Sequence, residues 1–488
     1  MSEWSIDMPE EDDDLNGFVE ITTEPQTQEQ KTIEKVKKWF AKGFDDVASR
    51  YMSGNSYKAL YDIFDVFKEN TTDIKPIEMA LGSLFLYALD LQLVDEEFLK
   101  QFDVSATWRV VKFTPVDICV LYEVLRYTIG IYGVIGLTPK NLVDNVTLTK
   151  NEFTLNVFLS FTHTNKEDVV EYNTSGNLYD PSYLLAVRHD MHAIMLVYRG
   201  TACVSDCATD LVAQPAQVTL FNKVGYCHDG IYHAGYRKFL QIESRLVSLV
   251  KMFPDYSIKV MGHSLGGGVA IVVSSLLKSE HPTWEINCYS FAPAGVFSRE
   301  IAGCPEMKKL VISFVGENDI VPRLSIGSFQ SYKRMVQEVY KKIGIKTTDV
   351  ILGTVKKVEN PRLVILKMIG DKKDELIAEL AHIVPEQPPF IPSGKVYQLI
   401  EKPQEKYDKS GNNEFDDWKW IDLDKRDEAV VCVEVPNECY ARIIPRMSMT
   451  IDHIPQAYQS IMGDYLEKVG RLKEIFPIKE KQEEQSNI

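Results

Sequence analysis

The chain contains few cysteines, and none of them stands in a metal-binding or redox spacing. Eight cysteines occur among 488 residues, and no two form a Cys-x-x-Cys pair. This pattern argues against zinc-binding modules, redox motifs and small disulfide-stapled domains. The first residues, Met1–Trp4, lead into an acidic stretch rather than the basic and then apolar pattern of a secretory signal. We therefore expect reduced thiols and a cytoplasmic location.

The chain also lacks a long uncharged apolar run and an excess of basic side chains. Stretch 79–93 is too short to cross a bilayer, and stretch 116–137 carries Asp117, Glu123 and Arg126, which are costly at membrane depth. We expect both stretches to be buried helices. The 54 basic and 70 acidic side chains give a net charge of −16. This charge argues against nucleic acid as a partner and against general attraction to anionic membranes, but it says little about neutral lipids.

The pentapeptide Gly-His-Ser-Leu-Gly at 262–266 is the most informative motif that is present. It follows an extended apolar run at 256–261 and precedes a helical pattern of small and apolar residues that continues to Leu277. A strand, a sharp turn and a helix are the context in which Gly-x-Ser-x-Gly forms a nucleophile elbow. The glycines let the strand and helix approach closely while the serine is held in a strained, exposed position. We predict that Ser264 is a nucleophile, with a plain packing turn as the alternative.

A serine hydroxyl needs a base and an acid that orients the base. In α/β hydrolases the acid follows the serine and the histidine comes last. Of nine histidines, His382 and His453 lie beyond Ser264 and a suitable acid. His382 lies in a charged stretch that a surface or packing helix explains better. His453 follows an apolar run at 440–444, which we expect to be a strand, and α/β sheets hold their sites at the carboxyl ends of strands. We predict that His453 is the base, with a capping or structural histidine as the alternative.

The acid is predicted by the same reasoning. Asp319 follows an apolar run at 310–315 of buried-strand length and lies on a turn-rich segment. Glu317 is its close rival. An Asx turn or a helix N-cap is the alternative role for Asp319.

An acyl-transfer site also needs N–H donors for the developing oxyanion. One donor comes from the residue after the nucleophile, here Leu265, and another from a loop after an earlier strand. The strand pattern at 193–198 is followed by Arg199-Gly200-Thr201. We predict that Thr201 and Leu265 form the oxyanion hole.

Six motifs in this order resemble those of the class 3 lipases, the fungal-lipase-like α/β hydrolases, and within them the sn-1-specific diacylglycerol lipases. The motifs are Tyr198-Arg199-Gly200-Thr201, His233-Ala234-Gly235-Tyr236, Gly262-His263-Ser264-Leu265-Gly266, Phe291-Ala292-Pro293, Asn318-Asp319-Ile320-Val321-Pro322-Arg323-Leu324 and Asp452-His453-Ile454-Pro455 with Tyr458. The resemblance covers about residues 180–460. It implies an α/β-hydrolase fold with a mostly parallel central sheet, the triad Ser264, Asp319 and His453, and an oxyanion hole of Thr201 and Leu265. The long interval between Asp319 and His453 also fits the diacylglycerol lipases, which carry an insertion there.

The composition along the chain suggests four parts. We expect a disordered acidic N-terminus at 1–30, an N-terminal helical region at 31–150, an α/β-hydrolase domain at 151–476 with an insertion at 325–395 near the active site, and a charged tail at 477–488. Residues 31–52 form a basic amphipathic pattern that suits either a membrane interface or packing on the protein body. Segment 202–232 suits a lid or an ordinary structural loop.

The resulting functional hypothesis is a serine lipase that hydrolyses acyl esters of neutral glycerolipids, with diacylglycerol at the sn-1 position as the implied substrate. Two alternatives stay open: a phospholipase A1 or other lipid acyl hydrolase or transferase, and a catalytically silent lipase-like signalling scaffold. The expected partners are a lipid substrate, peripheral contact with membranes or lipid droplets, and a strand-adding domain that would bind the short motif Phe18–Ile21. We expect no cofactor and no metal ligands; only the family resemblance raises calcium.

Overall fold

The computed structural model describes residues 82–83, 85–86, 89, 109–133, 150–173, 180–201, 215–343, 369–401, 430–446 and 449–470. The expected acidic N-terminus, the amphipathic segment 31–52, the motif Phe18–Ile21 and the charged tail lie outside these residues. Among the helices that are described, none is both long and apolar enough to cross a bilayer.

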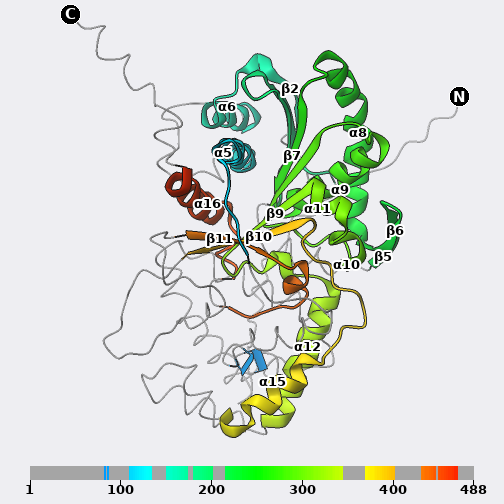
Figure 1. The fold of residues 1–488 in the computed structure, drawn as a ribbon, viewed down its shortest axis with the longest axis vertical. Helices are drawn as coiled ribbons and strands as arrows, with labels where there is room; N and C mark the ends of the chain where they lie inside the picture. Colours follow the sequence, from blue (N-terminus) through cyan, green and yellow to red (C-terminus); the bar gives the residue numbers. More distant parts are fainter. Residues whose placement is uncertain are drawn as a thin grey trace, which may run out of the picture.

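A nine-stranded sheet forms the centre of the described structure, in the order β1-β11-β10-β9-β8-β7-β4-β3-β2 (Figure 1). Its middle strands β4, β7, β8, β9 and β10 run parallel, and antiparallel strands extend both edges. The bounds are β1 Arg109–Val110, β2 Val169–Asn173, β3 Tyr183–Arg188, β4 Ala193–Tyr198, β7 Ser257–His263, β8 Ile286–Phe291, β9 Val311–Gly316, β10 Lys395–Glu401 and β11 Val430–Val435. The expected mostly parallel central sheet of an α/β hydrolase is confirmed.

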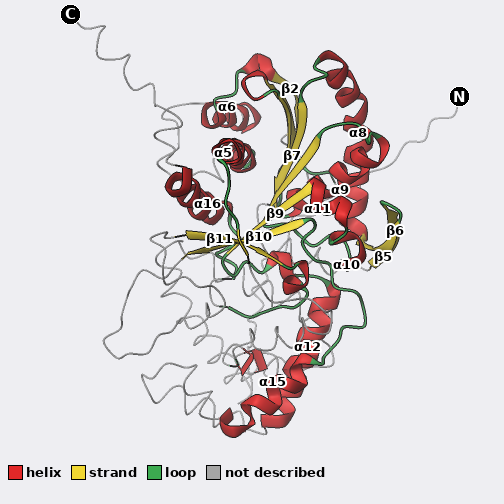
Figure 2. Ribbon diagram, in the orientation of Figure 1, coloured by secondary structure: helices red, strands yellow, loops and turns green. Residues whose placement is uncertain are grey.

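Helices cover both faces of this sheet (Figure 2). One face carries α5 (Pro115–Gly130), α6 (Lys150–Thr162) and α16 (Pro455–Gly470), and the other carries α8 (Asp229–Met252), α9 (Leu265–Glu280) and the short helices α10 (Arg299–Ala302) and α11 (Pro305–Leu310). Strand β4 shows why both faces are buried. Its alternate side chains Met195 and Val197 pack with the first group, whereas Ile194, Leu196 and Tyr198 pack with the second.

Helix α5 lies within the stretch 116–137 that the sequence predicts to be a buried helix. It begins with a capping box between Thr114 and Asp117, in which each side chain bonds the other's backbone N–H. The helix packs on β4 and β7. This part of the expected N-terminal helical region therefore lies directly on the sheet. The expected hydrolase domain begins at residue 151, but the edge strand β1, which lies before it in the sequence, already pairs with β11 of the same sheet.

The described parts of the insertion are mainly helical. Helices α12 (Ile326–Ile343) and α15 (Lys373–Ala381) contact each other, and a strap at 385–392 leads from α15 toward β10. The strap is fastened to the body by a bridge between Ile391 and Phe297. Residues 215–228 of the expected lid or loop form a hairpin of β5 (Pro215–Leu220) and β6 (Lys223–His228).

One strand prediction was wrong. Residues 440–444 do not form a strand, because β11 ends before Pro436 and a 3₁₀ turn at Asn437–Tyr440 follows. Around this segment, a distant side chain bonds backbone carbonyls that a neighbouring strand would bond in a sheet. The Arg323 guanidinium donates hydrogen bonds to the carbonyl oxygens of Cys439 and Arg442 at 2.6 and 3.3 Å. An apolar run alone cannot reveal this partner.

Candidate active site

Ser264 stands at the turn between β7 and α9, with backbone angles φ +60° and ψ −129°. A residue with a Cβ rarely adopts a positive φ, so the surrounding contacts must hold it there. The Ser264 N–H donates to the carbonyl of Phe291 at 2.9 Å, and its carbonyl accepts from Gly268 N–H at 3.1 Å. These bonds fix the serine where the strand ends and the helix begins.

The glycines on either side of Ser264 make this turn sterically possible. A Cβ on Gly262 would lie 2.3 Å from the carbonyl oxygen of Gly266, and one on Gly266 would lie 2.4 Å from the carbonyl oxygen of Tyr198. Both contacts are with backbone, which cannot rotate away. The expected strand, turn and helix around 262–266 are therefore present, with β4, β7 and the start of α9 in close contact.

The structure brings Ser264, His453 and Asp319 together although they are far apart in the sequence. The Nε2 atom of His453 lies 2.9 Å from Ser264 Oγ, and Nδ1 lies 3.0 Å from each carboxylate oxygen of Asp319. The three residues are 1%, 3% and 0% exposed, so the whole triad is buried. A neutral imidazole whose Nδ1–H donates to the carboxylate presents an unprotonated Nε2 to the serine hydroxyl.

Two further groups orient the Asp319 carboxylate. The Tyr458 hydroxyl donates to Oδ2 at 2.7 Å, and the backbone N–H of Val321 donates to Oδ1 at 2.9 Å. Burial and the nearby Asp319 charge raise the pKa of Tyr458 well above its usual value, so its hydroxyl keeps the proton that it donates. The carboxylate thus accepts bonds from His453, a tyrosine and a backbone amide.

Glu317, the rival acid, lies elsewhere in the same loop. Its Oε1 accepts a hydrogen bond from the backbone N–H of Glu401 on β10. Burial and the carboxylates of Asp452 and Glu401 raise the pKa of Glu317 to about 8. Its contacts therefore tie β10 to the loop, and the His453 ring is bonded to Asp319.

The predicted oxyanion loop lies directly beside the serine. A Cβ on Gly200 would be 3.0 Å from Ser264 Cβ and 2.5 Å from the His263 carbonyl oxygen, and Thr201 follows Gly200. Leu265 is the first residue of α9, where backbone N–H groups have no acceptor within the helix. Both predicted donors therefore belong to segments that border Ser264.

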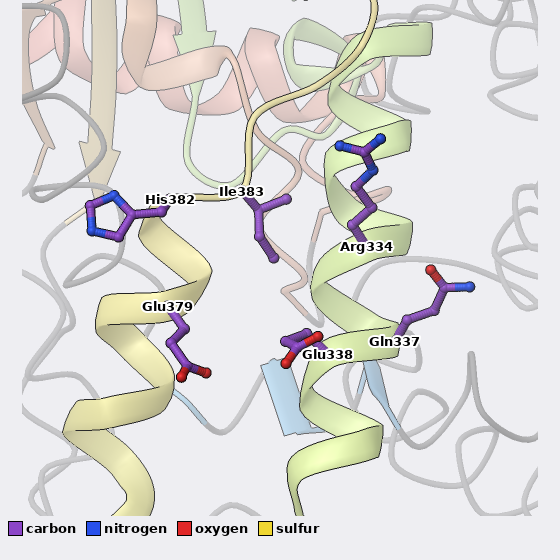
Figure 3. A pocket seen from close by; sticks show the side chains of 6 residues that line it. All are labelled: Arg334, Gln337, Glu338, Glu379, His382 and Ile383. Atoms are coloured by element: carbon purple, nitrogen blue, oxygen red, sulfur yellow. The ribbon is translucent and has the colours of Figure 1, made fainter.

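The other candidate base, His382, lies away from this site. It directly follows α15, at a shallow cleft between α12 and α15 (Figure 3). The cleft is lined by Arg334, Gln337, Glu338, Glu379, His382 and Ile383. None of the predicted site residues is among them.

Sequence reasoning missed three contributors to this site. Tyr458 and His263 belong to the motifs that carry the family resemblance, and Tyr132 lies in the apolar stretch 116–137. The sequence predicts no role in the site for any of the three. Tyr132 Oη lies 2.9 Å from His263 Nδ1, and His263 Nε2 lies 2.9 Å from the carbonyl oxygen of His453. A buried tyrosine near a histidine has no sequence signal when 131 residues separate the two.

Within the described ranges, no group of three or more His, Cys, Asp or Glu side chains could hold a metal ion. The cysteines in those ranges are free thiols: Cys119, Cys227, Cys288, Cys304, Cys432 and Cys439.

Comparison with known proteins shows similarity to lipases. Residues 195–329 match the family described as "Lipase (class 3)". Human diacylglycerol lipase-alpha is 22% identical over 321 residues, which cover 63% of this chain and 29% of that protein. Mouse diacylglycerol lipase-beta is 26% identical over 178 residues, 35% of this chain and 26% of that protein. The chain therefore aligns with under a third of the length of either relative.

A fungal lipase also matches part of this chain. The lipase of Rhizomucor miehei is 25% identical over 164 residues, 31% of this chain and 43% of that protein. The alignment with a solved structure of its propeptide complex covers 72% of this chain and 84% of that structure's chain, with 15% identity and a TM-score of 0.40. The chain is therefore similar to the class 3 lipases over residues 195–329 and, among named relatives, to the diacylglycerol lipases.

Proposed function

We propose that this chain is a serine lipase that hydrolyses acyl esters of neutral glycerolipids, with diacylglycerol cleaved at the primary sn-1 ester as its substrate. The observation that carries the proposal is the continuous hydrogen-bonded series Ser264 Oγ, His453 Nε2, His453 Nδ1 and Asp319. Such a series suits acyl transfer because it turns a poor nucleophile into a reactive one. The choice of a glycerolipid rests on the similarity to proteins named diacylglycerol lipases.

The proposed reaction has two halves. Ser264 Oγ attacks the ester carbonyl while His453 Nε2 takes its proton, and the oxygen that gains negative charge is held by N–H donors at Thr201 and Leu265. The C–O bond to the glycerol then breaks, and His453 returns the proton to the departing alcohol. Water then attacks the acyl-enzyme carbonyl while His453 Nε2 takes a proton from the water. The C–O bond to Ser264 Oγ breaks, His453 returns the proton to Oγ, and the fatty acid leaves.

Asp319 has an orienting role in this scheme. Its carboxylate holds Nδ1–H of His453 and stabilises the imidazolium that forms when the ring takes the serine proton. The burial of the site also matters. Because Ser264 is 1% exposed, we expect the site to open locally before a lipid reaches it, and low polarity around the buried triad strengthens the electrostatic contacts inside.

Labelling and turnover test this proposal together. We expect the intact protein to be labelled by a fluorophosphonate probe and to release the sn-1 fatty acid from diacylglycerol in detergent micelles. Ser264→Ala should abolish both. The matched control is Ser274→Ala, which removes a buried hydroxyl that bonds the Ala270 carbonyl within α9, and it should be labelled like the unmodified protein.

Each alternative has its own result. Release of fatty acid from phospholipids in preference to diacylglycerol would replace the proposed substrate with that of a phospholipase A1. Persistent labelling of Ser264→Ala would remove Ser264 as the nucleophile. A folded protein without any labelling or turnover would favour the scaffold alternative.

A further inference from the structure

A second histidine, His263, directly precedes Ser264 and packs against the ring of His453. The two ring centroids are 4.9 Å apart, and His263 is 1% exposed. Its two ring nitrogens bond two different segments. Nδ1 lies 2.9 Å from the hydroxyl of Tyr132, and Nε2 lies 2.9 Å from the backbone carbonyl oxygen of His453.

The hydrogen bonds around His263 have only one consistent direction. A carbonyl oxygen can only accept, so Nε2 of His263 must carry a proton and donate to His453. In the neutral ring, Nδ1 is then an acceptor, so the Tyr132 hydroxyl must donate to it. The Tyr132 oxygen in turn accepts from the backbone N–H of Gly200 at 3.2 Å. The bonds thus run from Gly200 through Tyr132 and His263 to His453.

We propose that Tyr132 and His263 are positioning residues that set the backbone of the oxyanion loop and the backbone of the base loop by one shared series of hydrogen bonds. This inference rests on the proposed function, because it assigns these residues a role in the same acyl transfer. Gly200 directly precedes Thr201, and the His453 carbonyl belongs to the residue whose ring bonds Ser264. Neither Tyr132 nor His263 needs to contact the substrate.

The packing around this series leaves little freedom. A Cβ on Gly200 would lie 2.6 Å from Tyr132 Oη and 2.5 Å from the His263 carbonyl oxygen. Tyr132 is 4% exposed, and its ring meets His263 edge-on with centroids 5.6 Å apart. Burial and the neighbouring His453 hold the pKa of His263 well below its usual value, which keeps its ring neutral and preserves the direction of the bonds.

Catalytic geometry is sensitive to such support. A displacement of about 1 Å in a catalytic group can lower a rate about 100-fold, and an oxyanion donor that is out of place has an effect of similar size. Loss of the series should therefore lower kcat more than it raises KM, because it disturbs the transition state and not the binding of the lipid.

The first test compares two tyrosines on neighbouring turns. Tyr132→Phe removes the hydroxyl of the series and keeps the ring. Tyr127→Phe removes an equally buried hydroxyl on α5 that bonds Thr164 Oγ1 at 2.6 Å. With a soluble short-chain ester, we expect kcat of Tyr132→Phe to fall about 10- to 100-fold with KM little changed, while Tyr127→Phe keeps kcat despite a similar loss of thermal stability.

The second test separates the two bonds of His263. His263→Gln places an amide N–H near the position of Nε2 and can still donate to the His453 carbonyl. His263→Asn places an amide oxygen near Nδ1 and can still accept from Tyr132, but it does not reach the carbonyl. We expect the kcat of His263→Gln to be about 10-fold higher than the kcat of His263→Asn.

The outcomes distinguish this inference from the proposed function. If the unmodified protein hydrolyses the ester and Ser264→Ala does not, but Tyr132→Phe matches Tyr127→Phe in kcat, the positioning role is wrong. The same conclusion follows if His263→Gln and His263→Asn lose equal fractions of kcat. If the folded, unmodified protein has no activity at all, the proposed function has failed, and the positioning role falls with it.

Discussion

The hydroxyl of Tyr458 donates a hydrogen bond to Asp319 Oδ2 at 2.7 Å, and its oxygen accepts another from the backbone N–H of Gly316 at 2.8 Å. Tyr458 lies on α16, whereas Gly316 ends β9 and Asp319 lies on the loop that follows. One phenol oxygen therefore joins the helix after His453 to the loop that carries the acid. Tyr458 therefore fixes the position of the acid relative to the base, and it need not touch the substrate to do so.

Removal of this hydroxyl should affect both stability and rate. Tyr458→Phe leaves the buried Gly316 N–H without this acceptor, and we expect the free energy of unfolding to fall by about 1–3 kcal/mol. We expect kcat on a short-chain ester to fall about 10-fold, because the carboxylate loses one orienting donor. Chemical unfolding and steady-state kinetics measure the two effects. Unchanged kcat in the folded variant would show that the hydroxyl serves stability alone.

Asp319 and Glu317 can be separated as candidate acids by isosteric amides. Asp319→Asn replaces the carboxylate with a neutral amide, which has one acceptor oxygen and does not stabilise the His453 imidazolium. We therefore expect kcat to fall about 10⁴-fold. Glu317→Gln keeps an oxygen that can accept from Glu401 N–H, and its kcat should remain near that of the unmodified protein. The reverse ranking of these two kcat values would make Glu317 the acid.

The raised pKa of Glu317 predicts how stability depends on pH. Its pKa rises from about 4.5 to about 8 on folding, so between these values the folded state binds a proton that the unfolded state has released. Stability from this group is therefore present below about pH 4.5 and is lost as the pH rises toward about 8. Glu317→Gln lacks this titration. We expect its melting temperature, relative to the unmodified protein, to increase from about pH 5 to about pH 8, and a constant difference would contradict the assignment.

The elbow should tolerate no side chain at its first glycine. Gly262→Ala would set a Cβ 2.3 Å from the Gly266 carbonyl oxygen, and we expect a loss of at least about 1–3 kcal/mol in stability together with loss of fluorophosphonate labelling. Gly463→Ala is the matched control within α16, where a Cβ would meet nothing within 4 Å. It should be neutral or stabilising by about 0.5–1 kcal/mol. A melting curve of Gly262→Ala that matches that of the control would refute the close approach.

The hydroxyl of Thr201 can be tested apart from its backbone N–H. Thr201→Val preserves the side-chain shape, and kcat should fall about 100-fold if the hydroxyl stabilises the oxyanion. Thr128→Val controls for removal of a threonine hydroxyl, since Thr128 Oγ1 bonds the Val124 carbonyl within α5. If both variants keep full kcat, oxyanion stabilisation at this loop would come from backbone donors only.

The local sequence determined the strands, the elbow and the candidate triad, because these depend on short-range properties. Runs of buried-strand length at 193–198 and 310–315 correspond to β4 and β9, and small residues around Ser264 allow the turn between β7 and α9. The chain order of an α/β hydrolase then narrowed the base to His382 or His453. The apolar run at 440–444 is not a strand, and within it the Arg442 carbonyl bonds the guanidinium of Arg323, which lies far away in the sequence.

Only the tertiary structure decided which side chains support the site. Tyr132 and Tyr458 have the pattern of core residues, and an apolar pattern reports burial but not the partner of a hydroxyl group. Those partners are 131 and 139 residues away in the sequence. They meet the tyrosines only because helices α5 and α16 pack on the same face of the sheet. A buried polar atom must find a partner wherever folding brings one within reach, and that choice is made by packing between distant segments.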